Sequence, residues 1–408
     1  MVSGAQSELN RNTIIGVVGA VGVPGRYGGF ETLAEQLARR ITPSMARLVL
    51  YCQRSAYPEM RGQADTRFFG HRRVFMPLRA NGPASLLHDA LAMLHAALVA
   101  RVDAMLVLGY SGAWALPLVR FLRPHMLIVT NIDGMEWRRD KFGPRAKRVL
   151  RWVEDCAVRF SHRIIADNAA LVPLVQSIHP GLHPLLIAYG GDHTMVPPAV
   201  SPVPAMPPYY LSIARIEPEN NCEMILKAFD VEPSRRLVFV GNWNASAYGR
   251  DLKAHYAQRP HMYLLDPVYD LSVLAGLRAG ACGYVHGHSV GGTNPSLVEA
   301  LFHTSRILAF DCSFNRSTLG GQGAYFADEE TLGNLLRTDV TLDMAPSVMQ
   351  TLHRRYGWDN IVEAYLNACS VYKDKKVDLS DSCDVFYMSA GGKIGHSAPC
   401  ERSAVEQK

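Results

Sequence analysis

Short apolar runs alternate along this chain with longer segments in which apolar residues recur every three or four positions. The first pattern is typical of strands buried in a parallel sheet, and the second of helices that cover such a sheet. In the first half we expect strands at 13–18, 47–51, 104–108, 126–130, 163–166 and 184–187. In the second half we expect strands at 209–213, 237–240, 262–265, 281–285 and 307–310. The alternation predicts an α/β fold with two doubly wound, Rossmann-like domains.

A proline-rich stretch separates the two halves. Six prolines lie between Val196 and Pro208, and this composition favours an extended linker. We therefore expect an N-terminal domain at 1–195, a linker at 196–208 and a C-terminal domain at 209–356. A helical pattern at 357–372 predicts a last helix that docks back on a domain. The polar remainder, 373–408, has no periodicity and is expected to be a loosely ordered tail without chemistry.

Composition adds few constraints. The 408 residues, 48% hydrophobic and 19% charged, are ordinary for a globular protein and too many for a single core. The polar first 12 residues lack the order of a signal peptide, and the apolar stretch Leu86–Leu108 contains five charged or histidine residues, so it reads as a helix followed by a strand. The eight cysteines include no C-x-x-C pair, which argues against a zinc site or a disulfide framework. We expect a cytoplasmic protein.

Positive charge is concentrated in one segment. Between Arg138 and Arg163 there are nine lysines or arginines against three acids, although the formal net charge is only +5. Such a run could attract phosphates or an anionic membrane surface; a solvated helix face is the alternative. We expect no nucleic-acid partner, because no nucleic-acid motif accompanies the run.

The first glycine-rich loop follows the first strand. Its glycines fall at G-x-x-G-x-x-G, and the next strand leads into Tyr51-Cys-Gln-Arg54 without an acid, which argues against a dinucleotide-binding enzyme. Gly28 and Gly29 precede a helix, where the backbone can approach a ligand closely and offer N–H groups to an anion. A plain tight turn is the alternative.

The second glycine-rich loop runs from His286 to Glu299. Gly287, Gly291 and Gly292 make a flexible connection, and Asn294-Pro295 is a cap followed by proline at the first helical position. N–H groups at the helix start could hold a diphosphate. Glu299 could accept hydrogen bonds from ribose hydroxyls, or it could simply face solvent. For His286 and His288 a turn or sugar contact is favoured over metal ligation, because no further ligands accompany them.

Further candidates follow other strands. Arg215 comes just after a strand, in the crevice where open sheets bind ligands, and its guanidinium can bind two phosphates in a forked manner. A salt bridge to Glu217 or Glu219 is the competing interpretation. Asp133 and Glu136 could bind sugar hydroxyls or handle a proton, or cap the helix that follows.

With these residues in view, the chain resembles glycosyltransferase family 4, of GT-B fold, and specifically its bacterial rhamnosyltransferase branch. The resemblance covers residues 14–372 and rests on three stretches, 24–32, 214–221 and 286–300. It implies two Rossmann-like domains facing a cleft, with Arg215 on the donor diphosphate and Glu299 on the ribose. The Gly28-Gly29 loop would serve the acceptor side or the sugar phosphate.

The sequence departs from the family pattern in three places. Asn220 and Asn221 stand where the family has a lysine, and Gly291 falls at the first glutamate of its E-x7-E motif. Asn131-Ile132-Asp133 replaces a histidine after the fifth strand of the first domain. These departures affect sugar positioning most.

We therefore expect a retaining, metal-independent glycosyltransferase of cell-surface polysaccharide synthesis, without a cofactor. It would move a deoxyhexose, from dTDP-rhamnose, to a lipid-linked saccharide at the inner face of the membrane. The expected catalytic residues are Asp133 and Arg215. The expected donor site comprises Arg215, Gly291, Gly292, Thr293, Asn294, Ser296 and Glu299. The expected acceptor or sugar-phosphate loop comprises Arg26, Tyr27, Gly28, Gly29, Glu31 and Glu136. A sugar-nucleotide epimerase and a non-enzymatic nucleotide-sugar-binding scaffold are the rival hypotheses.

Overall fold

The computed structural model describes residues 13–26, 28–63, 66–132, 134, 137, 142–199, 208–338 and 343–370. All of them belong to one compact unit, Met1–Lys373. The expected tail after 373, and most of the expected proline-rich linker, lie outside the described residues. No helix in the described ranges is long and apolar enough to cross a membrane.

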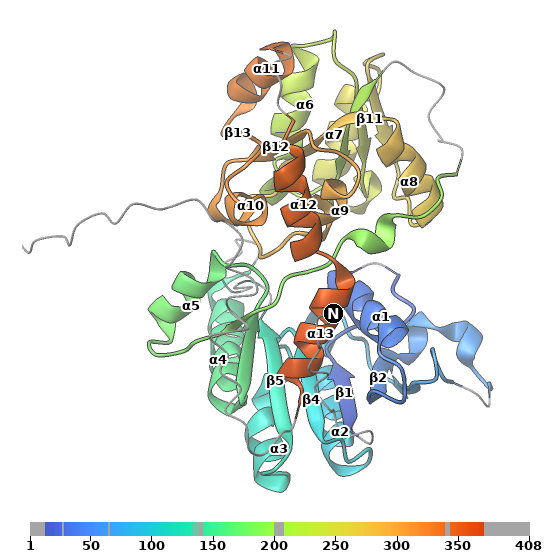
Figure 1. The fold of residues 1–408 in the computed structure, drawn as a ribbon, viewed down its shortest axis with the longest axis vertical. Helices are drawn as coiled ribbons and strands as arrows, with labels where there is room; N and C mark the ends of the chain where they lie inside the picture. The colour runs from blue at the N-terminus through green and yellow to red at the C-terminus, as the bar shows by residue number, and fades with distance from the viewer. Residues whose placement is uncertain are drawn as a thin grey trace, which may run out of the picture. The chain divides into compact units, whose positions relative to one another are not determined.

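The first sheet is parallel and has seven strands in the order β3-β2-β1-β4-β5-β6-β7. Its strands β5, β4, β1 and β2 are labelled side by side in Figure 1. The strands are β1 (Ile14–Val18), β2 (Arg47–Gln53), β3 (Arg72–Met76), β4 (Ala104–Leu108), β5 (Leu127–Ile132), β6 (Arg163–Ala166) and β7 (Leu185–Leu186). The helices between them are α1 (Gly29–Arg40), α2 (Ser85–Leu98), α3 (Leu116–Leu122), α4 (Pro144–Phe160) and α5 (Leu171–Ile178). The strand order reverses between β1 and β4, which creates a crevice at their carboxyl ends.

The second sheet is also parallel and has six strands in the order β10-β9-β8-β11-β12-β13. Its strands are β8 (Tyr209–Ile213), β9 (Leu237–Val240), β10 (Met262–Leu265), β11 (Ala281–His286), β12 (Ile307–Phe310) and β13 (Ala324–Phe326). Its helices are α6 (Cys222–Asp230), α7 (Ala247–Tyr256), α8 (Leu271–Ala279), α9 (Pro295–Leu301), α10 (Ser313–Thr318), α11 (Glu329–Thr338) and α12 (Pro346–Arg355). Here the order reverses between β8 and β11.

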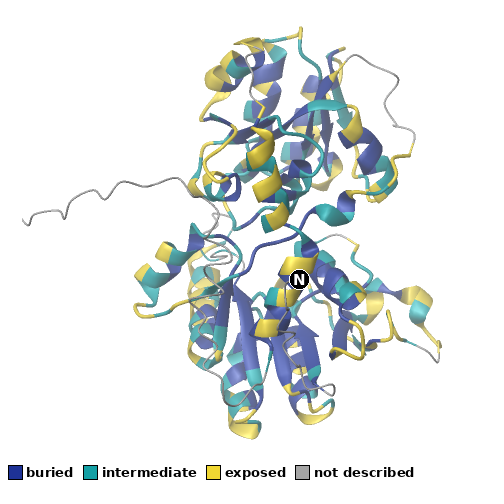
Figure 2. Cartoon of the chain, in the orientation of Figure 1, coloured by how far each residue is buried: buried dark blue, intermediate teal, exposed yellow. Residues whose placement is uncertain are grey.

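The expected α/β class is confirmed, and each strand expected from the sequence is present. Two strands were not expected, β3 and β13. β13 has only three residues, and β3 begins with two arginines. Arg73 is nevertheless buried, because its guanidinium donates hydrogen bonds to the carbonyls of Thr66 and Val23. The strands of both sheets are largely buried, and exposed residues gather on the outer sides of the helices (Figure 2).

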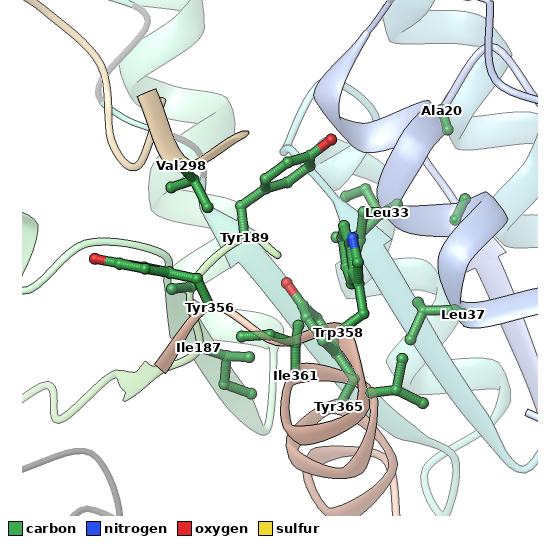
Figure 3. Close-up of a cluster of buried hydrophobic side chains, with 14 of the residues drawn as sticks. Ala20, Leu33, Leu37, Ile187, Tyr189, Val298, Tyr356, Trp358, Ile361 and Tyr365 are labelled. Atoms are coloured by element: carbon green, nitrogen blue, oxygen red, sulfur yellow. The ribbon is translucent and has the colours of Figure 1, made fainter. Parts of the chain in front are cut away.

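The last described helix, α13 (Trp358–Ala368), packs against α1 and first-sheet residues. Trp358, Ile361 and Tyr365 are buried in a cluster with Leu33 and Leu37 of α1 (Figure 3). Polar contacts reinforce the packing. Asn131 Nδ2 at the end of β5 donates to Tyr365 Oη at 2.6 Å, and Arg163 NH1 donates to the Ala368 carbonyl at 2.6 Å. The five-part division of the chain stays a prediction.

Candidate active site

Two loops meet where the strand order of the second sheet reverses. The Arg215 loop follows β8, and the glycine loop, defined here as residues 287–294, follows β11. Asn221 Nδ2 donates to the Gly287 carbonyl at 2.8 Å, and Ser289 Oγ donates to the Glu219 carbonyl at 2.7 Å. A Cβ at Gly287 would lie 2.3 Å from the Asn220 carbonyl oxygen, so this contact requires glycine. The two stretches singled out in the sequence therefore form one structure.

Arg215 combines a fixed backbone with an available side chain. Its carbonyl accepts a hydrogen bond from Asn220 Nδ2 at 2.8 Å, while its side chain is 42% exposed. The nearest carboxylate oxygen, on Glu217, is 3.6 Å from Arg215 NH1, so the competing salt bridge is present but loose. Asn220 and Asn221, which replace the lysine implied by the resemblance, brace the two loops.

Glu299 is held by a buried arginine that the sequence analysis did not single out. Arg278, at the end of α8, is 3% exposed, and its NH2 lies 2.5 Å from Glu299 Oε2. The Glu299 side chain is 17% exposed, so the solvent-facing alternative does not describe this residue. Burial raises the pKa of Glu299, and the Arg278 charge opposes that rise. Ribose binding by Glu299 stays a prediction.

A histidine from the segment after β7 faces the other oxygen of this carboxylate. His193 Nε2 lies 3.6 Å from Glu299 Oε1. Trp358 Nε1 donates to His193 Nδ1 at 2.9 Å, which places the ring proton on Nε2. Burial lowers the pKa of His193 to about 3, so the ring is neutral at physiological pH. Glu299 is thus linked through His193 to α13.

Helix α9 begins at Pro295, as the sequence predicts, and Asn294 is its N-cap residue. The Asn294 side chain makes no capping hydrogen bond; its Oδ1 lies 3.4 Å from Ser296 Oγ. The rings of His286 and His288 are stacked with centroids 4.5 Å apart. Among the described residues, no group of three or more His, Cys, Asp or Glu side chains could hold a metal ion.

Three residues of the N-terminal half lie close to this region. A Cβ at Gly29 would lie 3.1 Å from Pro295 Cγ, and one at Gly134, just after β5, would lie 3.5 Å from Gly291 Cα. Asp167, just after β6, accepts a hydrogen bond from the Thr293 N–H at 3.0 Å. Residues that follow strands of the first sheet, and the residue that begins α1, therefore border the glycine loop of the second sheet. The predicted residues Asp133, Glu136 and Tyr27 lie outside the described residues.

The loop that leads into α1 is held by two carboxylates outside it. Glu31 is buried, and its Oε2 accepts a hydrogen bond from the Arg26 N–H at 2.8 Å. The Arg26 guanidinium pairs with Glu59. Gly28 is the N-cap of α1, which begins at Gly29. Glu31 and Arg26 thus shape this loop, and the Gly28-Gly29 pair brings it close to α9.

Arg278, His193 and Asp167 were missed by sequence reasoning. Asp167 carried an available indication, since it directly follows β6, and Arg215 lies only two residues after β8. Arg278 and His193 carried none, because their roles arise from contacts with Glu299, which is 21 and 106 positions away in the sequence.

The basic residues of the segment 138–163 have two different environments. Arg145, Arg148, Arg151 and Arg159 lie exposed on α4, whereas Arg163 caps the C-terminal carbonyls of α13. Exposed aromatic rings accompany the α4 charges: Trp152 on α4 is 56% exposed, and Phe121 on the adjacent α3 is 82% exposed. Arg138, Arg139 and Lys141 lie outside the described part of the chain.

Comparisons with known proteins identify the fold. No curated protein matches this chain. Residues 109–192 match a family described as "Domain of unknown function (DUF1972)". Sucrose-phosphate synthase from Thermosynechococcus elongatus is similar in structure, with a TM-score of 0.70, 13% identity, and coverage of 92% of this chain and 100% of that one.

Two further glycosyltransferase structures resemble the chain. The catalytic domain of starch synthase IV from Arabidopsis thaliana, bound to ADP and acarbose, has a TM-score of 0.65 and 11% identity, with coverage of 90% of this chain and 100% of that one. The pneumococcal O-GlcNAc transferase GtfA, in complex with UDP and GlcNAc, has a TM-score of 0.51 and 13% identity, with coverage of 71% and 61%. The chain therefore has an α/β fold of the GT-B type.

Proposed function

We propose that this protein is a glycosyltransferase that takes a sugar from a nucleoside diphosphate. The observation that carries the proposal is the position of the glycine loop, which is joined to the Arg215 loop on one side and contacted by first-sheet residues on the other. The fold supports it, and so do the ligands of two neighbours, one bound to ADP and one to UDP.

The proposed chemistry is a metal-independent transfer with retention of configuration. The bond between the anomeric carbon and the diphosphate breaks, and an acceptor hydroxyl oxygen bonds to that carbon on the same face. The hydroxyl proton leaves with the diphosphate oxygen. Arg215 stabilises the negative charge that develops on the leaving group, and Glu299 orients the ribose. Asp133 is proposed to take this proton from the acceptor hydroxyl and to pass it on to the diphosphate oxygen.

The proposed donor is dTDP-rhamnose, and the proposed acceptor is a saccharide linked to a membrane lipid. The exposed charges and rings of α3 and α4 support a position at an anionic membrane, because basic side chains attract acidic head groups and aromatic rings enter the interface. We propose that the protein acts in polysaccharide synthesis at the inner face of the cell membrane.

One experiment tests the function directly. The protein is incubated with a panel of nucleotide sugars and a membrane-lipid extract, and the products are identified by mass. We expect a deoxyhexose to be added to a lipid-linked saccharide. Conversion of a nucleotide sugar without acceptor would favour an epimerase instead. Binding without transfer would favour a scaffold, an alternative motivated by the missing lysine and by the use of Asn220 and Asn221 as loop braces.

A further inference from the structure

Helix α2 carries leucines on its outer side. The exposed residues of this helix are Leu87, Leu91 and Leu98, and each is about half exposed. They are spaced by four and seven positions, which places them on one face of the helix. The outer face of a helix in a globular protein normally carries charged or polar residues. The outer face of α2 instead has the composition of a face that is usually buried.

Helix α3 continues this apolar surface. It contacts α2, and its exposed residues, Leu118, Phe121 and Leu122, are all apolar as well. Single exposed apolar residues are ordinary, but a patch formed by two adjacent helices is typical of an interaction site. The apolar face is defined here as the six exposed residues of α2 and α3.

Cations accompany the apolar face on the same side of the first sheet. Buried residues of α2, α3 and α4 belong to one core cluster, so the three helices form one layer. Of the acids on these helices, Asp89 and Glu154 are buried, and Asp155 pairs with an arginine. The arginines exposed on α4, which contacts α3, are Arg145, Arg148, Arg151 and Arg159.

This combination fits an anionic bilayer better than a second copy of the chain. A two-fold contact between copies would join the same surface of each, so both sets of α4 arginines would gather around one interface, where like charges repel. An anionic bilayer offers acidic head groups to the arginines and acyl chains to the leucines. Binding of a helical surface to such a bilayer increases with both contributions.

We propose that the apolar face of α2 and α3 enters the acyl-chain boundary of an anionic membrane while the α4 arginines bind its head groups. This inference rests on the proposed transfer to a lipid-linked acceptor. It adds to the charge attraction of α4 an apolar contact that salt does not screen, because screening acts on charges alone. The first sheet is then held on the membrane by insertion as well as by charge.

Salt separates the two contributions. Co-sedimentation of the full chain with vesicles of phosphatidylcholine and phosphatidylglycerol is measured in about 0.1 M and about 1 M NaCl, between which the Debye length falls from about 10 Å to about 3 Å. Wild type should still bind vesicles at high salt. The variant L87Q/L91Q/F121Q, which places a good helix former at exposed positions, should bind about a hundredfold more weakly there.

The single variant F121Q keeps the test decisive if the triple variant fails to fold, since this ring is the most exposed of the apolar face. It should weaken high-salt binding by about tenfold. The matched control V231Q/Y269Q/L271Q removes three exposed apolar side chains from the half of the chain that forms the second sheet. It should bind vesicles as wild type does.

Three results would overturn the inference. One is a wild-type protein that leaves the vesicles at high salt, and another is equal high-salt binding of wild type and F121Q. The third is a dimer of the free protein, seen by sedimentation velocity, that L87Q/L91Q/F121Q abolishes, because the apolar face would then bind a second copy.

Vesicle binding is measured without donor or acceptor, so its outcome is separate from that of the proposed function. With an acceptor dissolved in detergent, L87Q/L91Q/F121Q should transfer sugar as fast as wild type. Absence of transfer by the wild-type protein to any acceptor would refute the proposed function, and salt-resistant vesicle binding would still be observed.

Discussion

At the scale of a single residue, substitution of Arg215 tests the proposed chemistry. Its backbone is braced by Asn220 and its guanidinium is available, so Arg215→Ala removes charge without disturbing the core. If the guanidinium stabilises the leaving diphosphate, turnover should fall by about tenfold to a hundredfold or more. Steady-state kinetics with the donor found in the panel measures the change.

A matched variant separates this role from general charge effects. Arg250 is exposed on α7, and Arg250→Ala should leave turnover unchanged. Equal rates for Arg215→Ala and wild type would remove Arg215 from the site.

Glu154 should make the unfolding free energy depend on pH. This carboxyl is buried on α4, and its Oε2 accepts a hydrogen bond from Trp137 Nε1 at 2.9 Å. Burial raises the pKa of Glu154 from 4.5 to about 7. The unfolded chain therefore loses this proton at lower pH than the folded chain, so the stability falls as the pH rises from about 4.5 to about 7.

The expected loss is about 3 kcal/mol of unfolding free energy across that range. Glu154→Gln keeps an acceptor for Trp137 and should flatten this part of the pH profile, measured by urea unfolding between pH 5 and pH 8. The exposed Glu223, paired with Lys227, provides the control Glu223→Gln, whose profile should match wild type. An unflattened profile for Glu154→Gln would mean that its pKa is not raised.

At the scale of elements, the packing of α13 depends on Trp358. The indole is fully buried against the rings of Tyr189 and His193, and its Nε1 donates to His193. Trp358→Ala should cost about 3–5 kcal/mol of unfolding free energy. Trp358→Phe, which keeps most of the volume but loses the hydrogen bond, should cost less.

Urea unfolding measures both variants, and Trp152→Ala is the control for loss of an exposed indole. That control should change stability by no more than about 0.5 kcal/mol. Equal stability of Trp358→Ala and wild type would contradict the packing described for α13.

The membrane proposal is tested on α4. Arg145 and Arg148 are exposed on this helix, and each basic residue near an anionic surface contributes about 1 kcal/mol to binding. Reversing both charges (R145E/R148E) should weaken co-sedimentation with vesicles of phosphatidylcholine and phosphatidylglycerol by about tenfold to a hundredfold. The effect should shrink at high salt.

Reversal of Lys227 and Arg250, which are exposed on α6 and α7 of the second sheet, changes the net charge equally. That control should bind vesicles as wild type does. If both pairs of reversals weaken binding alike, net charge rather than the α4 surface is responsible.

At the scale of the whole molecule, the chain returns to its first sheet after completing the second. Residues 13–199 alone would lack the side chains of α13 that cover Leu33 and Leu37 of α1. We expect this fragment to bind a hydrophobic dye and to unfold without a sharp transition. Fusing residues 356–370 to it through a flexible linker should restore cooperative unfolding, as followed by circular dichroism. A sharp transition in the bare fragment would contradict this dependence.

The sequence predicted the sheets well because buried parallel strands appear as continuous apolar runs. It also predicted that the Arg215 loop and the glycine loop follow strand ends, as they do; their role as a ligand site stays a prediction. It did not predict β3, whose Arg73 is buried only because distant carbonyls accept its hydrogen bonds. The contacts of Arg278 and His193 with Glu299 were not predicted for the same reason. A buried charge pair or ring contact between distant residues leaves no local pattern in the sequence.

The hydrogen bond between Asn131 and Tyr365 joins residues 234 positions apart. The chain leaves the ribosome with its N-terminus first, so β5 and α1 emerge long before α13, the helix that covers them. Folding of the first sheet can therefore be completed only after nearly all of the described chain has been synthesised. Until then, part of its apolar surface is uncovered. Folding of the N-terminal half should be completed late in translation, and this interval is when the nascent protein depends most on chaperones.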